Sequence, residues 1–185
     1  MKKIMISKKY SDFLKEIIDD SMKTACEHSD EEVTDFSTSN NISCDEAYAY
    51  FLKHYGNDYI KDGFFYCRKN EKYEMDILFG LDSGNGNICK EIEDDRDFLP
   101  DFVIPIIALP GGDFVCMDKN DGRIYFWFHD TAWDNLLFVE KSFEKFILHF
   151  EKSEEESSVK PVSFSIDSDM DNLLKKTAEK YKMGK

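Results

Sequence analysis

Apolar residues recur every three or four positions near the start of the chain, which is the period of an α-helix. From Tyr10 to Ala25 they form one stripe, and the charged side chains between them face the other way. This pattern predicts an amphipathic helix that packs on the core by one side. Ser29 and Glu32 then have the spacing of a capping box, which predicts the start of a short second helix.

A further helix-start signal lies at Ser43 to Glu46, and the apolar residues that follow it up to Tyr55 predict a third helix. Gly56 comes directly after this segment. Because glycine readily adopts the left-handed conformation that often ends a helix, we expect Gly56 to end this one.

From Gly63 onward the pattern changes to short β-type runs separated by turn residues. Five runs are predicted to be strands, namely residues 64–68, 73–79, 102–109, 114–118 and 123–128. The connections at Lys69–Lys72 and Asn120–Gly122 have hairpin lengths, so neighbouring strands should be antiparallel. Asp121-Gly122 is the stronger type I′ signal, because that turn needs positive φ at both central residues.

The runs at 114–118 and 123–128 contain consecutive apolar residues rather than an alternation of apolar and polar ones. Both faces of these strands are therefore predicted to be covered, with helices on one side. A last apolar run at 136–139 is followed by Ser142, which is expected to cap a helix that extends to Phe150.

The composition changes after residue 150. Residues 151–161 are charged and serine-rich, which is typical of a linker, and residues 167–182 have the weak periodicity of a short helix. We therefore divide the chain into an N-terminal helix packed on the core (1–28), an α+β domain (29–150), and a charged linker with a short C-terminal helix (151–185).

Charge narrows the choice of partner. The chain has 185 residues, of which 38 are acidic and 24 basic, so its formal net charge is −14. This excess argues against direct binding of nucleic acid or of an anionic membrane, because both would repel it. A basic partner is favoured instead. The alternative is that the charge only keeps the protein in solution.

The five cysteines are widely spaced and form no C-x-x-C pair, so neither a disulfide framework nor a zinc site is predicted. We expect no other metal and no cofactor. The N-terminus lacks the apolar segment of a signal peptide, and no run approaches 18 apolar residues. A cytoplasmic location without a membrane span is therefore expected.

Signals for catalysis are weak. The four histidines and five cysteines would permit a Cys-His pair, but no local signature surrounds any of them. The loop at Gly84–Asn87 lacks the residues that complete a phosphate-binding loop and is expected to be flexible. Glu93, Asp94 and Asp95 could supply a general acid or base, although adjacent acids in a polar stretch are usually solvated. We predict no catalytic residue.

Two tryptophans flank His129 and Asp130 at the end of a predicted strand. Trp127 is either a core residue or the centre of a binding surface. Trp133 lies in a polar loop and is the better interface candidate, because exposed aromatic side chains beside carboxylates suit protein recognition.

Three motifs in sequence order carry a resemblance to a known family. They are the Ile-Pro-Ile-Ile-Ala strand at 102–108, the Gly-Gly-Asp turn and strand at 111–118, and the strand at 122–130 that ends in His-Asp. With the helices at 46–57 and 142–147, they resemble the SUKH superfamily of SMI/KNR-like immunity and cell-wall-regulator domains over residues 29–150. Two departures are Cys44-Asp45 in place of the usual Leu-Pro, and Gly56-Asn57 in place of Asn-Gly.

The resemblance implies a single α+β domain with a mixed, mostly antiparallel sheet of about five or six strands wrapped by helices. It also implies a binding module and not an enzyme. Many bacterial members look like immunity proteins that bind and neutralise a cognate polymorphic or contact-dependent toxin, often a nuclease. The expected partner is therefore a toxin with a basic surface, which an acidic protein can reach quickly by electrostatic steering.

Under this interpretation the acidic residues steer the toxin and form rim pairs, and an aromatic side chain anchors the centre. The steering residues are Glu91, Glu93, Asp94, Asp95 and Asp97. The centre is assigned to Trp133, with His129 and Asp130 near it. The alternatives are a regulatory scaffold of the same fold, or a small hydrolase that uses His129.

Overall fold

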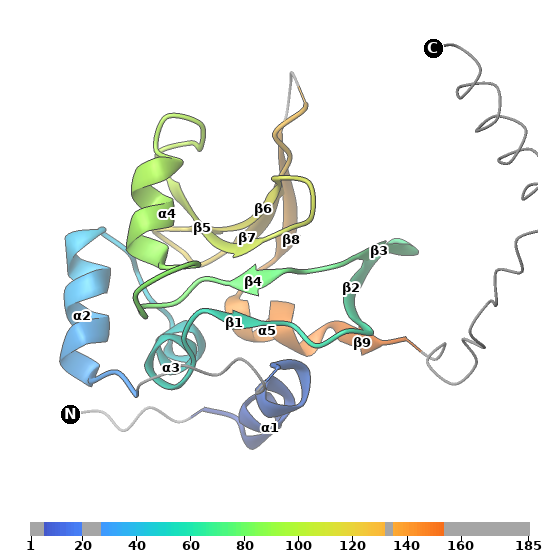
Figure 1. Ribbon diagram of the computed structural model, residues 1–185, viewed down its shortest axis with the longest axis horizontal. Coiled ribbons are helices and arrows are strands. Elements are labelled where there is room, and N and C mark those ends of the chain that lie inside the picture. Colours follow the sequence, from blue (N-terminus) through green and yellow to red (C-terminus); the bar gives the residue numbers. More distant parts are fainter. Residues whose placement is uncertain (1–5, 20–26, 132–134, 154–185) are drawn as a thin grey trace, which may run out of the picture. The chain divides into compact units, whose positions relative to one another are not determined.

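The computed structural model describes residues 6–19, 27–131 and 135–153 of the chain (Figure 1). The helices in these ranges are α1 (Lys8–Ile17), α2 (Asp30–Ser39), α3 (Glu46–His54), α4 (Ile88–Asp94) and α5 (Phe143–Leu148). The strands are β1 (Asp58–Tyr59), β2 (Phe64–Arg68), β3 (Glu71–Tyr73), β4 (Ile77–Leu78), β5 (Val103–Ala108), β6 (Phe114–Asp118), β7 (Ile124–Trp127), β8 (Leu136–Glu140) and β9 (Phe150–Lys152). The predicted C-terminal helix at 167–182 lies outside the described residues.

The strands form two sheets. Six strands lie in the order β1-β4-β5-β6-β7-β8, and three lie in the order β3-β2-β9. Every pair of neighbouring strands is antiparallel. An isolated parallel bridge joins Gly80 to Asn87. The α+β class is therefore confirmed, and the second, three-stranded sheet adds to the single sheet that the sequence suggested.

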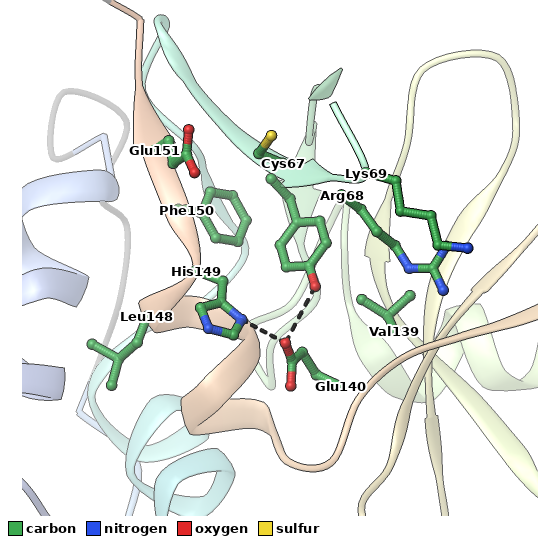
Figure 2. Close-up of a pocket in the computed structure, with 10 residues that line it drawn as sticks. Cys67, Arg68, Lys69, Val139, Glu140, Leu148, His149, Phe150 and Glu151 are labelled. Atoms are coloured by element: carbon green, nitrogen blue, oxygen red, sulfur yellow. Dashed lines mark hydrogen bonds and ion pairs between the residues drawn. The ribbon is translucent and has the colours of Figure 1, made fainter. Parts of the chain in front are cut away.

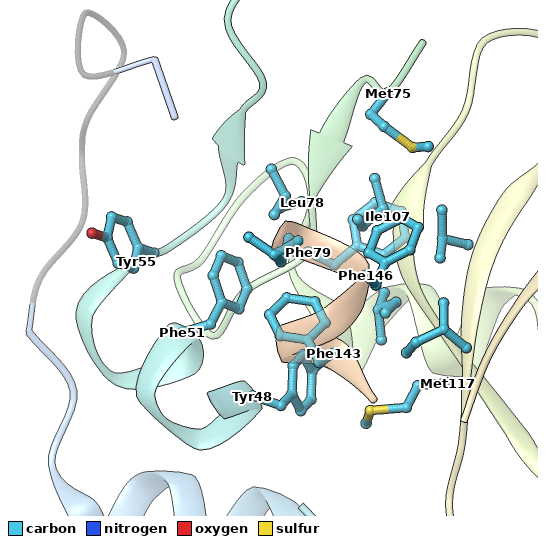
Figure 3. Close-up of a cluster of buried hydrophobic side chains, with 14 of the residues drawn as sticks. Tyr48, Phe51, Tyr55, Met75, Leu78, Phe79, Ile107, Met117, Phe143 and Phe146 are labelled. Carbon is cyan, nitrogen blue, oxygen red and sulfur yellow. The ribbon is translucent and has the colours of Figure 1, made fainter. Parts of the chain in front are cut away.

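The main core lies between the helices and one face of the six-stranded sheet. Figure 3 shows how aromatic side chains fill it, with Tyr48 and Phe51 of α3 facing Phe143 of α5. The ring centroids of Tyr48 and Phe51 lie 5.0 Å and 5.5 Å from that of Phe143. Phe146 of α5 continues the cluster to Phe126 of β7 at 6.5 Å. These large rings join helices and sheet into one apolar interior.

The opposite face of the sheet carries a smaller cluster. Leu99, Val103, Cys116 and Trp127 are buried there. Along β6, Val115 and Met117 belong to the main core while Cys116 belongs to this second cluster. The predicted covering of both faces thus holds for Cys116 and Trp127, whereas Tyr125 of β7 is only half-buried on the second face. The second cover is the turn with Leu99 after α4, and not the body of a helix.

The first helix is shorter than predicted. It ends at Ile17, and Ile18 is already extended with φ −83° and ψ 134°. Ile18 forms an antiparallel bridge with Ile60, and the Asp19 N–H donates to the Tyr59 carbonyl at 2.9 Å. Pairing of this β-branched stretch with the segment at β1 therefore overrides the helical period. Residues 20–26 lie outside the described part.

The capping box at Ser29 and Glu32 is confirmed, because each side chain bonds the backbone N–H of the other residue. The next helix begins two residues later than predicted. Asp45, and not Ser43, is its N-cap, and the Asp45 carboxylate accepts from the Tyr48 N–H at 2.7 Å. The Ser43 N–H instead donates to the Lys119 carbonyl at 2.6 Å. A tertiary bond to the β6–β7 loop thus keeps Ser43 out of the helix.

Gly56 does not end α3 in the predicted left-handed conformation. The C-cap is Tyr55, which is extended with φ −130°. Glycine is needed at position 56 for close packing, since a Cβ atom there would lie 2.0 Å from the Asp82 Oδ2 atom.

The ranking of the two hairpin turns was wrong. Lys69 and Asn70 both have positive φ, 50° and 68°, so the β2–β3 connection has the type I′ geometry. In the β6–β7 connection Gly122 has φ 72°, but Asp121 is not in the positive region. The predicted strand at 73–79 is also divided, because its two ends join different sheets as β3 and β4.

Candidate protein-binding site

The predicted steering residues lie on a helix that the sequence did not reveal. Helix α4 begins at Asn87, whose side chain accepts from the Lys90 N–H at 3.0 Å and donates to the Asp82 carbonyl at 2.9 Å. Ile88 is fully buried and fixes the first turn to the core. The end of the loop that was expected to be flexible is therefore a helix cap.

We call residues 91–101 the acidic segment. It contains the carboxylates of Glu91, Glu93, Asp94, Asp95, Asp97 and Asp101, with Arg96 as its one basic residue. Glu91, Glu93 and Asp94 lie on α4, Asp95 is its C-cap, and Asp97 follows in the turn. Glu93, Asp94 and Asp97 are exposed. The structure thus presents the predicted steering residues together on one short stretch of surface.

Partial burial and neighbouring negative charge raise the pKa of two carboxylates of the acidic segment. Partial burial, followed by the nearby charge of Asp95, raises the pKa of Glu91. Partial burial, followed by the charge of Asp94, raises the pKa of Asp95. Asp94 has a basic neighbour in Lys90, but their charged atoms are 3.9 Å apart. A cation placed on this segment would therefore relieve repulsion between its own carboxylates.

His129 is held by two carboxylates at the end of β7. Its Nδ1 atom lies 2.8 Å from the Asp113 Oδ1 atom, and its backbone N–H donates to the same oxygen at 3.0 Å. Its Nε2 atom lies 3.1 Å from the Asp130 Oδ1 atom. The hydrogen bond with Asp113 raises the pKa of His129. This arrangement ties the end of β7 to the turn before β6.

The two predicted groups belong to segments that join the sheet at opposite ends. The acidic segment leads into β5 where Val103 pairs with Asp118. His129 follows β7 where Trp127 pairs with Phe114. The five residues of β6 lie between these ends, a length of about 15 Å. Antiparallel pairing, which no local motif reveals, sets this separation.

Of the two tryptophans, only Trp127 lies among the described residues. Trp133 lies outside the described residues. Trp127 is 6% exposed and stacks on Phe114 with ring centroids 5.7 Å apart. Trp127 is therefore a core residue of the second cluster, which resolves the two interpretations that its sequence position left open.

Three phenylalanines that were not among the predicted site residues are exposed. Phe98 is 69% exposed, Phe102 is 43% exposed and Phe138 is 42% exposed. Phe98 lies within the acidic segment, and Phe102 directly follows it. The charged surroundings of Phe98 gave no clear signal of its exposure, because Leu99, the next residue in the same stretch, is buried.

A polar pocket of about 420 Å³ lies between β2, β8 and the junction of α5 with β9. Figure 2 shows Glu140 and His149 facing each other across it. The Glu140 Oε1 atom lies 2.5 Å from His149 Nδ1 and accepts from the Tyr66 hydroxyl at 3.5 Å. Burial, followed by the charge of Glu140, raises the pKa of Tyr66 to about 12. These contacts connect the edge of the large sheet to the small one.

The described residues contain neither a metal-binding cluster nor a helix that could span a membrane, and two of their cysteines have a raised pKa. Nowhere in these ranges do three His, Cys, Asp or Glu side chains meet in a way that could hold a metal ion. Among the described helices, none has the length and apolar run needed to cross a membrane. Cys116 is fully buried, and burial raises its pKa. Burial likewise raises the pKa of Cys44 to about 12.

Fold and surface together define an antiparallel α+β domain with a carboxylate-rich and aromatic exterior. Residues 28–149 match the SMI1 / KNR4 family (SUKH-1), and the chain belongs to this family. The family supports an immunity-protein or regulator-type role and is generally non-enzymatic.

The chain is also similar to a curated protein of Bacillus subtilis (strain 168), the SPbeta prophage-derived uncharacterized protein YokK. The two are 27% identical over 124 residues, which cover 54% of this chain and 62% of that relative. The chain thus spans less than two thirds of the length of the relative it matches.

Proposed function

We propose that this chain is a non-enzymatic bacterial immunity protein that works in the cytoplasm and neutralises a cognate polymorphic or contact-dependent toxin. The observation that carries the proposal is the acidic segment, which contains six carboxylates and one arginine on helix α4 and the turn after it. Membership of the SMI1 / KNR4 family supports a role of this kind.

The physical argument concerns complementary charge. A nuclease toxin has a basic cleft shaped for phosphates, and an acidic surface can cover that cleft. The mutual repulsion of Glu91, Asp94 and Asp95 falls when lysine or arginine side chains approach. Long-range attraction also speeds association by a factor of about 10 to 1,000, and salt weakens it. Electrostatics therefore gives this protein a means to capture a toxin before the toxin reaches its substrate.

The test first searches the genes next to that of this chain for a secreted protein with a toxin-like C-terminal domain, and uses that domain as the binding partner. The variant E93Q/D94N/D95N removes three charges from the acidic segment. At low salt we expect its association rate with the toxin domain to fall about tenfold and to depend less on salt. Stopped-flow fluorescence or biolayer interferometry at several salt concentrations measures both quantities.

The matched control is D12N/D62N/E74Q, which removes three exposed charges outside the acidic segment. It changes the net charge equally, so a local effect must exceed the effect of this control. Equal rates for the two triple variants would show that the acidic segment does not steer the toxin. Failure of the unmodified protein to bind and inhibit the toxin domain would refute the immunity function itself.

A further inference from the structure

Three aromatic side chains form a continuous row across the second face of the six-stranded sheet. Phe102 precedes β5, Tyr125 lies on β7 and Phe138 lies on β8. The ring centroids of Phe102 and Tyr125 are 6.5 Å apart at 86°, and those of Tyr125 and Phe138 are 5.8 Å apart at 74°. We call these residues the aromatic row. Its edge-to-face contacts fix the rings with respect to one another.

The aromatic row is a surface feature on a firm base. Phe102 and Phe138 keep 43% and 42% of their surface exposed, and Tyr125 is half-buried. Beneath the row, Val103 and Cys116 belong to the buried second cluster, and Tyr125 pairs directly with Cys116. Aromatic side chains, which have only two χ angles, lose little conformational entropy when a partner covers them. Such a patch marks an interaction site.

Charge identifies the kind of occupant. The acidic segment ends at Asp101, directly before Phe102, so carboxylates border one end of the row. The other end is basic, because Phe138 lines a cavity of about 400 Å³ with Lys9, Lys141 and Lys145 as well as Glu140, so cationic side chains of a partner fit at the Phe102 end only. A second copy of this chain would add another net charge of −14, which opposes self-association. A basic protein partner meets no such repulsion, and its cationic side chains can pack over phenyl rings.

We infer that the aromatic row is the desolvated centre of the toxin-binding surface, with the acidic segment as its rim. The partner is a toxin domain that places an apolar side chain on Phe102 and Phe138 and lysine or arginine side chains on the carboxylates beside Phe102. This inference rests on the proposed function and assigns the anchor to the row. Carboxylates at the rim then determine the association rate, while the rings determine how long the complex lasts.

The experiment compares the variant F102S/F138S with the unmodified protein, using the toxin domain found by the search described above. We expect the dissociation constant to rise about 100-fold, mainly through faster dissociation, while the association rate changes less than threefold. Because 43% and 42% of the two residues' surface is exposed, the melting temperature should fall by only a few degrees, and binding is measured well below it. The control is Tyr59→Ser on β1, which removes a partly buried ring at the opposite edge of the sheet from β8.

Each outcome has a defined meaning. An unchanged dissociation constant for F102S/F138S, with binding otherwise intact, overturns the assignment of the row but leaves the immunity function standing. A dimer of the free protein that the same variant converts to a monomer in light scattering would also overturn it, since the row would then bind a second copy. If the unmodified chain does not bind the toxin domain, the proposed function fails first. Faster dissociation confined to the row variant supports the inference.

Discussion

Gly56 lies against the side chain of Asp82, and this contact allows a sharp test of how α3, β4 and α4 are held together. An alanine Cβ at position 56 would come within 2.0 Å of Asp82 Oδ2 and 2.8 Å of its Cγ atom. Asp82 Oδ1 lies 2.9 Å from the His28 Nε2 atom. Gly56→Ala must therefore displace the Asp82 carboxylate, whose side chain is 12% exposed, and overpacking of this kind costs about 1–3 kcal/mol.

The same substitution should behave differently once the carboxylate has gone. In an Asp82→Ala background the nearest atom of that side chain is its Cβ, at the ordinary contact distance of 3.4 Å. The φ angle of Gly56 is not positive, so alanine is tolerated there and restricts the unfolded chain, which stabilises by about 0.4–1 kcal/mol. The sign of the Gly56→Ala effect is thus expected to reverse, with a coupling energy of about 2 kcal/mol.

Urea unfolding of the unmodified chain, the two single variants and the double variant at pH 7 and 25 °C measures this coupling. Gly80→Ala is the control, because its Cβ would meet the backbone of Gly56 at 2.5 Å and should destabilise the protein in both backgrounds. In melting experiments 1 kcal/mol corresponds to about 2–4 °C for a domain of this size. Additive free energies for Gly56→Ala and Asp82→Ala would refute the packing argument.

Two further predictions concern the turn after α4 and the cluster at His129. Leu99→Ala should lower the free energy of unfolding by about 2–5 kcal/mol, because Leu99 is buried on the second face of the sheet, whereas Phe98→Ala should change it by less than about 0.5 kcal/mol. Comparable urea midpoints for these variants would contradict the assigned burial. The raised pKa of His129 adds stability that is present below its unfolded pKa of about 6.5 and is lost as pH rises through the folded pKa. Asp113→Asn should therefore destabilise most below that pH, and an NMR titration in which it leaves the His129 pKa unchanged would contradict this.

Much of the fold could be predicted because local signals and tertiary contacts agree there. The capping box at Ser29 and the runs that became β2 and β6 appear at the expected residues. Predictions were wrong where a backbone group pairs with a residue far away in the sequence and not with a neighbour in a helix. Ile18 bonds to the segment at Ile60, and Ser43 bonds to the loop at Lys119. Nothing within a few residues of these positions in the sequence announces either partner.

In the candidate site, too, local features could be predicted from the sequence, and features that depend on distant partners could not. The charge of the acidic segment is a property of composition, so the sequence alone was enough to select it. Its helical form was hidden, because α4 is short and the residues before its cap at Asn87 resemble a loop. The aromatic row was not predictable at all, since Phe102, Tyr125 and Phe138 become neighbours only through the pairing of β5 to β8.

The acidic segment and the aromatic row act on a partner over different distances. Carboxylates act over a distance of about 8–10 Å at physiological salt, so their effect depends little on the exact geometry of α4. The phenyl rings act only in contact, and their spacing depends on the register of antiparallel strands. Substitutions in the acidic segment can therefore retune attraction to basic partners while the sheet stays intact. If the proposed function holds, selectivity among basic partners comes from the aromatic row, because only a partner with matching apolar side chains can cover rings whose positions the sheet fixes.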